Sequence, residues 1–512
     1  MNLKSLLKIT TSLLLVFSIL VSCSDDDDNG STVLRVTVDS NSQSQNLLIG
    51  ESIDLTFNIT ADVGYASASV QAANGTATIS SQPSVGATSG TVVVSFTANS
   101  AGAGTVTLTV TDEDGVSDDA VAAVSISEEE TEILVSGNIT SDTTWETGKT
   151  YILGGRIAVE AGATLTIQEG VVVKGEAGAG ANASVLLIAR DATLNAMGTA
   201  ELPIIFTSVA DEILPEDIAA GNFGSPNLDP NVNGLWGGLI VLGNAPISAS
   251  AATVQIEGIP TSDSNGLYGG DDPNDSSGTI TYISIRHGGT NIGEGNEING
   301  LTLGGVGDGT VIENVEVVAN QDDGIEWFGG NVSVTGIVIW NAGDDGLDTD
   351  QDWIGTASDF IIVSPGGSGF ELDGPEGTLN RGCHTFNNGV LYAGDDIFSL
   401  VDYDGNTNAG VNDLYIYGWS ASYGPIADNP GTPDEDETLN PIDSFGGDGN
   451  CPSTNWEYTL TGGGNDAATI FAGVSGGVLT EVGLNANTVG PAAADFPWTW
   501  ANQSGALSDI GL

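Results

Sequence analysis

A short acidic phrase recurs in the C-terminal half of the chain and carries the residues best suited to chemistry. Two full copies span Asp322–Trp327 and Asp344–Thr349, and degraded copies span Gly367–Leu372 and Asp395–Leu400. Each full copy opens with paired aspartates and places a further carboxylate two residues after its glycine. Ca²⁺ is a hard cation that takes about six to eight oxygen ligands, and carboxylates at this density suit it. The phrase therefore predicts calcium binding.

The regular spacing of the copies assigns their side chains to faces. If each copy is a strand, alternation turns the apolar residues on both sides of each carboxylate inward. The carboxylates then form an outer column with copies about 4.8 Å apart, where they repel unless protons or a cation neutralise them. The inward residues are Ile325, Leu347, Phe370 and Phe398, followed by Trp327, Thr349, Leu372 and Leu400, whereas the outer column is Glu326, Asp348 and Glu371, with Asp350 and Asp373 beside it.

The paired aspartates admit two interpretations. Aspartate side chains commonly satisfy backbone N–H groups at turns, so the pairs could serve the corners between strands. Alternatively, they add ligands to the calcium site of the outer column. The candidate metal ligands are therefore Glu326, Asp348, Asp350, Glu371, Asp373, Asp322, Asp323, Asp344 and Asp345, and the equivalent pair in the last copy is Asp395 and Asp396.

Aromatic residues are concentrated among and after the acidic copies. Exposed rings flanked by carboxylates can stack on a sugar and hydrogen-bond its hydroxyl groups. Trp353 and Tyr403 fall in expected turns and are the candidate ligand-binding residues. Internal stacking is the alternative, and it is favoured for Trp327, whose column points inward.

The sequence offers little support for catalysis. A glycosidase needs two carboxylates at a set separation, and a surface with this many carboxylates discriminates little. Arg286-His287 and Arg381 with His384 are candidates for a polysaccharide lyase, but nothing in their spacing requires a shared groove. Both histidines are predicted to be structural. We expect a non-catalytic protein, with a polysaccharide-degrading enzyme as the alternative.

A fixed period of short apolar runs broken by Gly and Asp indicates a solenoid of strands, with roughly one coil per repeat. The sequence predicts a parallel β-helix over residues 133–455 and a cap over residues 456–512 that covers the last coil. Residues 211–235 and 260–278 lack the period and are expected to be loops that leave the helix.

The N-terminal part is organised differently. Residues 1–22 have the basic start and apolar run of a removed secretory signal. Leu20–Cys23 resembles the lipobox of bacterial lipoproteins, which implies a lipid on Cys23, and residues 23–32 form an acidic tether. Alternating strands predict an immunoglobulin-like β-sandwich spacer over residues 33–127, with residues 128–132 as a linker.

Charge and cysteine content restrict the partners and the compartment. The chain has 9 basic and 68 acidic residues and a net charge of −59, which disfavours nucleic-acid binding and favours divalent cations. Plain solubility is the competing explanation for this charge. Cys383 and Cys451 are expected to form a disulfide in an oxidising compartment, with two buried thiols as the alternative.

Several motifs together resemble a known group of proteins. They are Trp236–Gly238, Tyr268–Asp272, Asp322–Gly330 and Trp500–Leu507. The stretch from residue 133 to the C-terminus resembles poorly characterised Bacteroidota surface lipoproteins with a right-handed parallel β-helix of the pectate lyase-like fold. Some of these lie beside TonB-dependent outer-membrane transporters.

The resemblance implies an all-β protein anchored by lipid in the outer membrane and exposed at the cell surface. It implies no catalytic residues. The expected role is capture of a glycan or nutrient, or service as an accessory subunit of a transporter. The alternatives are a polysaccharide-degrading enzyme and an adhesin.

Overall fold

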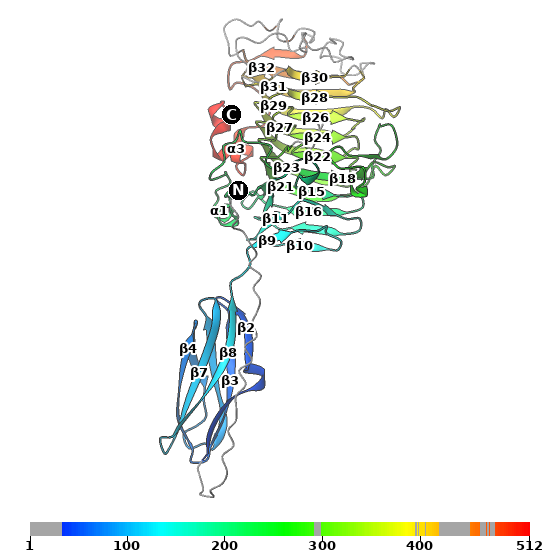
Figure 1. The fold of residues 1–512 in the computed structure, drawn as a ribbon. Helices are drawn as coiled ribbons and strands as arrows, with labels where there is room; N and C mark the ends of the chain where they lie inside the picture. Colours follow the sequence, from blue (N-terminus) through cyan, green and yellow to red (C-terminus); the bar gives the residue numbers. More distant parts are fainter. Residues whose placement is uncertain are drawn as a thin grey trace, which may run out of the picture. The chain divides into compact units, whose positions relative to one another are not determined.

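The computed structural model describes residues 33–290, 298–394, 397, 399–404, 406–418, 451–460, 467, 471 and 477–512. The chain divides into two compact units, Met1–Glu129 and Glu130–Leu512 (Figure 1). The signal, Cys23, the acidic tether, Asp395, Asp396 and Phe398 lie outside the described residues. Among those that are described, no helix has the length and apolarity needed to cross a membrane.

Two four-stranded sheets form the N-terminal unit. Their strands alternate buried and exposed residues, so that Phe57, Val94 and Leu108 fill one core shared by both sheets. One sheet has the order β1 (Leu34–Val38), β3 (Ser52–Ala61), β6 (Ser89–Ala98) and β5 (Gly75–Ser81), and the other has β2 (Ser44–Leu48), β8 (Ser117–Ser127), β7 (Gly102–Asp112) and β4 (Tyr65–Ala73). All pairings are antiparallel except that of β2 with β8.

Long parallel sheets form the second unit, in the arrangement of a parallel β-helix (Figure 1). Their strands are short and strongly apolar because both faces are covered, as in the fully buried Val185–Ile188. We call one of them the acidic sheet: β12 (Arg156–Val159), β15 (Val185–Ile188), β18 (Leu239–Leu242), β22 (Leu301–Gly304), β24 (Ile325–Phe328), β26 (Leu347–Asp350), β28 (Ser368–Leu372) and β30 (Ser399–Tyr403).

The other parallel sheet, which we call the large sheet, has fifteen strands within the described residues. They are β9 (Glu132–Val135), β10 (Thr143–Trp145), β11 (Thr150–Leu153), β13 (Thr164–Ile167), β14 (Val172–Gly175), β16 (Thr193–Met197), β17 (Ile204–Ser208), β21 (Gly278–Arg286), β23 (Val311–Val318), β25 (Val334–Trp340), β27 (Thr356–Val363), β29 (His384–Tyr392), β31 (Ala409–Tyr417), β32 (Thr454–Tyr458) and β33 (Leu479–Glu481).

Both expected loops pack back onto the solenoid. Within residues 211–235, α1 (Pro215–Ala219) places Ile218 in an apolar cluster with Ile205 of β17. The second loop is longer than expected: it spans residues 243–277 between β18 and β21, and it carries the antiparallel pair β19 (Val254–Gln255) and β20 (Leu267–Tyr268). Its Ile247, Ile256, Ile259 and Tyr268 cover the outer face of the acidic sheet.

The sequence predicted a cap over the last coil, whereas the described part of the C-terminal segment contributes strands to the large sheet and packs along its flank. Trp456 belongs to β32, a regular strand of the large sheet. Residues 489–512, with α3 (Trp500–Gln503) and α4 (Ala506–Asp509), pack along the outer face of the large sheet. That face carries Val318, Val338 and Ile361, which are fully buried beneath this segment. We call residues 489–512 the C-terminal strap.

Candidate metal centre

Strand register builds the predicted column. In the parallel pairs of β24, β26 and β28, Glu326 lies opposite Asp348, and Asp348 lies opposite Glu371. Their neighbours Ile325, Leu347 and Phe370 are fully buried on the inward side. The three carboxylates therefore stack on one face of the acidic sheet, as strand alternation predicts.

The fourth copy of the phrase is in a different register from the expected one. Phe370 pairs with Val401, and Leu372 pairs with Tyr403, so Leu400 does not continue its expected column. The longer connection between β28 and β30 shifts the strand relative to the glycine spacing. This shift places Asp402 opposite Glu371 and extends the acid column by one residue.

The column is much more buried than an outer face suggests. Glu326 and Asp348 are only 7% and 6% exposed, and Glu371 is half-buried. Glu257, from the excursion between β18 and β21, lies close enough to Glu326 to affect its ionisation. The column is therefore enclosed, and its charges are poorly solvated.

In the two pairs that the structure describes, the second aspartate is buried and accepts a hydrogen bond from a backbone N–H group of the next coil. The Asp323 Oδ1 atom accepts a hydrogen bond from the Asp345 N–H at 2.9 Å, and the Asp345 Oδ1 atom accepts one from the Ser368 N–H. The first members differ, because Asp322 is half-buried and Asp344 is exposed. Each of these two pairs thus places one buried carboxylate next to the column.

Two groups of three carboxylates have oxygen atoms that all lie within 4.8 Å of one another. One group is Asp323, Glu326 and Asp348, and the other is Asp323, Asp345 and Glu371. Calcium–oxygen distances of about 2.3–2.6 Å place ligands on opposite sides of an ion about 5 Å apart, so each group has a suitable span. Asp322, Asp344, Asp350 and Asp373 belong to neither group.

Burial makes it energetically unfavourable for the carboxylates of the column to ionise. It raises the pKa of Asp323, Glu326 and Asp348 well above the ordinary range, and neighbouring carboxylates raise these values further. Burial likewise raises the pKa of Asp345 to about 6 and, together with Asp404, that of Asp373 to about 7. Without a cation, the column must therefore retain protons near neutral pH.

Two buried oxygen atoms, one in the column and one beside it, have no hydrogen-bond partner among the residues that the structure describes. Among the described residues, the buried Asp348 Oδ1 atom and the Oδ1 atom of fully buried Asn299 have no hydrogen-bond partner. The Asn299 Nδ2 atom donates to Glu326 and, at 3.5 Å, to Glu257 Oε1. An orphaned buried oxygen costs about 1–3 kcal/mol, which a bound cation would offset.

Asn299 was missed by the sequence analysis although a signal exists. Asn299-Gly300-Leu301-Thr302 is a further copy of the phrase, one coil before Asp323-Gly324-Ile325-Glu326. Its amide and hydroxyl groups replace the carboxylates, so a search for acidic residues overlooks it. Glu257 lies in the aperiodic excursion and has no such signal.

Of the two predicted sugar-binding aromatics, Trp353 is buried and Tyr403 is half-buried. Trp353 is 1% exposed, stacks on Trp327 with ring centroids 4.6 Å apart, and donates its Nε1–H to the Val332 carbonyl. Tyr403 lies at the end of β30 and packs half-buried against the β-helix core. The shifted register explains why Tyr403 is half-buried: it pairs with Leu372 and therefore takes the inward position.

Both histidines are buried. His384 packs against Trp353 and Phe386, and burial lowers its pKa to about 3. His287 contacts the Val232 carbonyl and the Trp500 ring, and burial lowers its pKa as well. Neither histidine reaches an open groove, which agrees with the structural roles predicted for them.

The two arginines that lie near these histidines in the sequence are each paired with a carboxylate. Arg286 is fully buried beside Glu316, with 3.6 Å between Arg286 Nη2 and Glu316 Oε2. The Arg381 Nε atom lies 3.0 Å from Asp352 Oδ2. The structure also joins Cys383 and Cys451 in a disulfide with a Cα–Cα distance of 5.8 Å.

Comparison with known proteins identifies the type of domain. Residues 137–391 match the family model described as a pectate-lyase like beta helix domain. A solved structure of a family 28 exopolygalacturonase from Yersinia enterocolitica is similar at 11% identity over 89% of each chain. Its TM-score is 0.20, so it carries no argument about function. No curated protein matches the chain significantly.

Proposed function

We propose that this protein is a non-catalytic cell-surface scaffold whose pectate-lyase-like β-helix is stabilised by calcium. The observation that carries the proposal is the buried Asp348 Oδ1 atom, which has no partner among the described residues and lies in a group of three carboxylates. All donors in that group are carboxylate oxygens, which suit Ca²⁺ rather than a softer metal.

The location follows from the N-terminal residues. Leu20–Cys23 and the aspartates behind it support a lipid anchor on Cys23 and export to the outer surface of the outer membrane. The immunoglobulin-like unit then acts as a spacer. A TonB-dependent transporter is the proposed partner, and cross-linking in the native membrane followed by mass spectrometry tests for it.

Ligand capture rests on fewer observations. The burial of Trp353 removes the proposed aromatic platform, so glycan or nutrient binding is supported by the family resemblance alone. The enzyme alternative is supported only by the description of the matched domain. Polysaccharide binding and depolymerisation assays distinguish these roles.

Calcium removal tests the central proposal. Dialysis of the full mature chain against EDTA should lower its melting temperature by about 5 °C or more, because a ligand that binds only the folded state stabilises it. Added Ca²⁺ should restore the melting temperature. An unchanged melt in EDTA would contradict the proposal.

The exposed Asp344 provides a matched control. Asp344→Asn removes the same charge from the same phrase but lies outside both carboxylate groups. This variant should keep the full calcium-dependent shift in melting temperature. Asp348→Asn should reduce that shift.

A further inference from the structure

The two carboxylate groups overlap at a single residue. Asp323 belongs to both, Glu326 and Asp348 complete one group, and Asp345 and Glu371 complete the other. Asp323 also receives the Asp345 backbone N–H on its Oδ1 atom, which fixes the carboxylate between two coils. A carboxylate held in this way can bridge two cations without having to move.

The charge of these five carboxylates exceeds what one ion can neutralise. One divalent cation compensates two negative charges and leaves three in an enclosed site. A second divalent cation reduces the remaining charge to one, which is the smallest value that whole divalent ions leave uncompensated.

Shared protons are the competing way to neutralise the column. Glu326 lies within hydrogen-bonding reach of Asp348, and Asp345 lies within reach of Glu371, so each pair could hold one proton. That arrangement leaves the Asn299 Oδ1 atom without a partner among the described residues. Two cations neutralise the same pairs and also offer a partner to the Asn299 Oδ1 atom.

We infer that the column binds two calcium ions that share Asp323 as a bridging ligand. Glu326 and Asp348 complete the first site, and Asp345 and Glu371 complete the second. Asn299 is a positioning residue for the first site, because its amide donates to Glu326. This inference rests on the calcium binding proposed above and adds its stoichiometry and its shared ligand.

Calcium stoichiometry tests the inference directly. The full mature chain is stripped with EDTA, desalted and titrated with Ca²⁺, and bound metal is counted by equilibrium dialysis with elemental analysis. The wild type should bind two ions per chain. Asp348→Asn and Glu371→Gln should each bind one ion, and their double variant should bind none. Asp344→Asn should bind two.

The bridging role of Asp323 has its own variant. Asp323→Asn keeps an Oδ1 acceptor for the Asp345 N–H but removes the charge that both sites share, so it should lose both ions or bind them at least tenfold more weakly. Two ions bound with unchanged affinity would overturn the bridge. If this variant does not fold, the single and double variants above still decide the stoichiometry.

The outcomes separate the two proposals. A wild type that binds a single ion, with that ion lost in both single variants, would overturn the two-site inference and leave the calcium scaffold intact. A wild type that binds no calcium would overturn both. Two ions that remain in Asp348→Asn and in Glu371→Gln would show that the sites lie elsewhere.

Discussion

At the scale of single residues, one carboxylate can serve both fold and site. Asp323 and Asp345 each accept a backbone N–H from the following coil, and each also belongs to a cluster that suits a cation. The two interpretations of the paired aspartates are therefore compatible. Backbone capping positions the carboxylate, and the cation is proposed to neutralise it.

The burial of Trp353 leads to a prediction about stability. Trp353→Ala should lower the free energy of unfolding of the β-helix by about 3–5 kcal/mol, because it removes a ring that is stacked on Trp327 and leaves a cavity. Denaturant titration measures this loss. Trp353→Phe should cost less. A loss of sugar binding with unchanged stability would instead favour an exposed platform.

His384 should make stability sensitive to acid. Its pKa of about 3 in the fold lies below the unfolded value of about 6.5, so the unfolded chain takes up the proton first as the pH falls. The stabilisation is complete above the unfolded pKa and declines by about 2 kcal/mol between pH 6.5 and pH 5. Urea titrations of the wild type and His384→Phe at both pH values measure this decline. An equal loss in the free energy of unfolding between the two pH values in both proteins would contradict the prediction.

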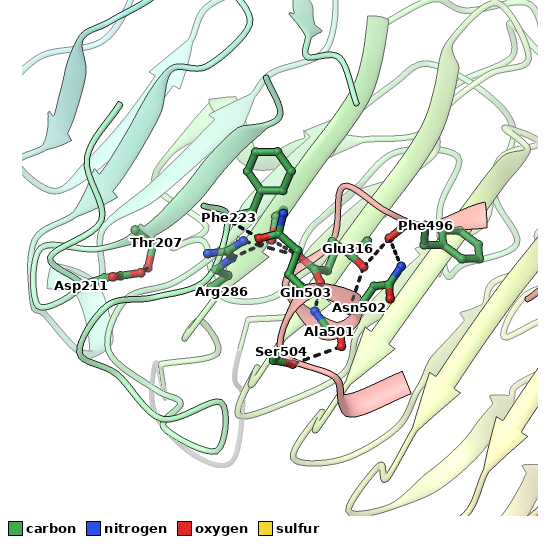
Figure 2. A network of polar contacts seen from close by, with 12 residues as sticks. Thr207, Asp211, Phe223, Arg286, Glu316, Phe496, Ala501, Asn502, Gln503 and Ser504 are labelled. Carbon is green, nitrogen blue, oxygen red and sulfur yellow. Dashed lines mark hydrogen bonds and ion pairs between the residues drawn. The ribbon is translucent and has the colours of Figure 1, made fainter. Parts of the chain in front are cut away.

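At the scale of elements, the C-terminal strap is attached through a buried polar network (Figure 2). Glu316 of β23 accepts the Ala501 N–H at 2.9 Å and a hydrogen bond from Ser284, and it pairs with Arg286. The Arg286 guanidinium also lies 5.0 Å from the centre of the Trp500 ring. The strap and two strands of the large sheet therefore share one charge pair.

Breaking this pair should be costly. Glu316→Gln leaves the Arg286 charge buried without its partner, and we expect a loss of about 3–5 kcal/mol in the free energy of unfolding. Glu313→Gln is the control, because Glu313 is exposed on the same strand. Urea titration of both variants provides the measurement. Equal, small losses would show that the pair contributes little.

Strand alternation predicts more of the site than of its surroundings. The residue spacing places Glu326, Asp348 and Glu371 in one column because alternation is a local property of strands. Glu257, which lies near Glu326, belongs to the excursion between β18 and β21, whose packing depends on contacts far apart in sequence and has no period to reveal it. The strap also packs through contacts far apart in sequence, which is why its place along the flank of the solenoid was not predicted.

At the scale of the whole molecule, the two units have separate hydrophobic cores. Every carboxylate of the proposed calcium sites lies in the second unit. The N-terminal unit is therefore an internal reference for any effect of calcium on stability.

Calorimetry can use this reference. We expect two unfolding transitions, of which EDTA shifts only the one from residues 130–512, because only that unit contains the carboxylate groups. Limited proteolysis at each transition identifies the unit that unfolds. A shift of both transitions by the same amount would indicate a general effect of salt or charge.

The course of the C-terminal strap also has a consequence for biosynthesis. The strap covers Val318, Val338 and Ile361, yet it is translated after all the strands that carry them. Until the strap has been translated, that apolar face has no cover, and the Arg286–Glu316 pair lacks the Trp500 ring and the Ala501 N–H. Folding of this unit therefore cannot be completed before the strap has been made, and a premature stop codon just before Trp500 should be nearly as harmful as one in the middle of the solenoid.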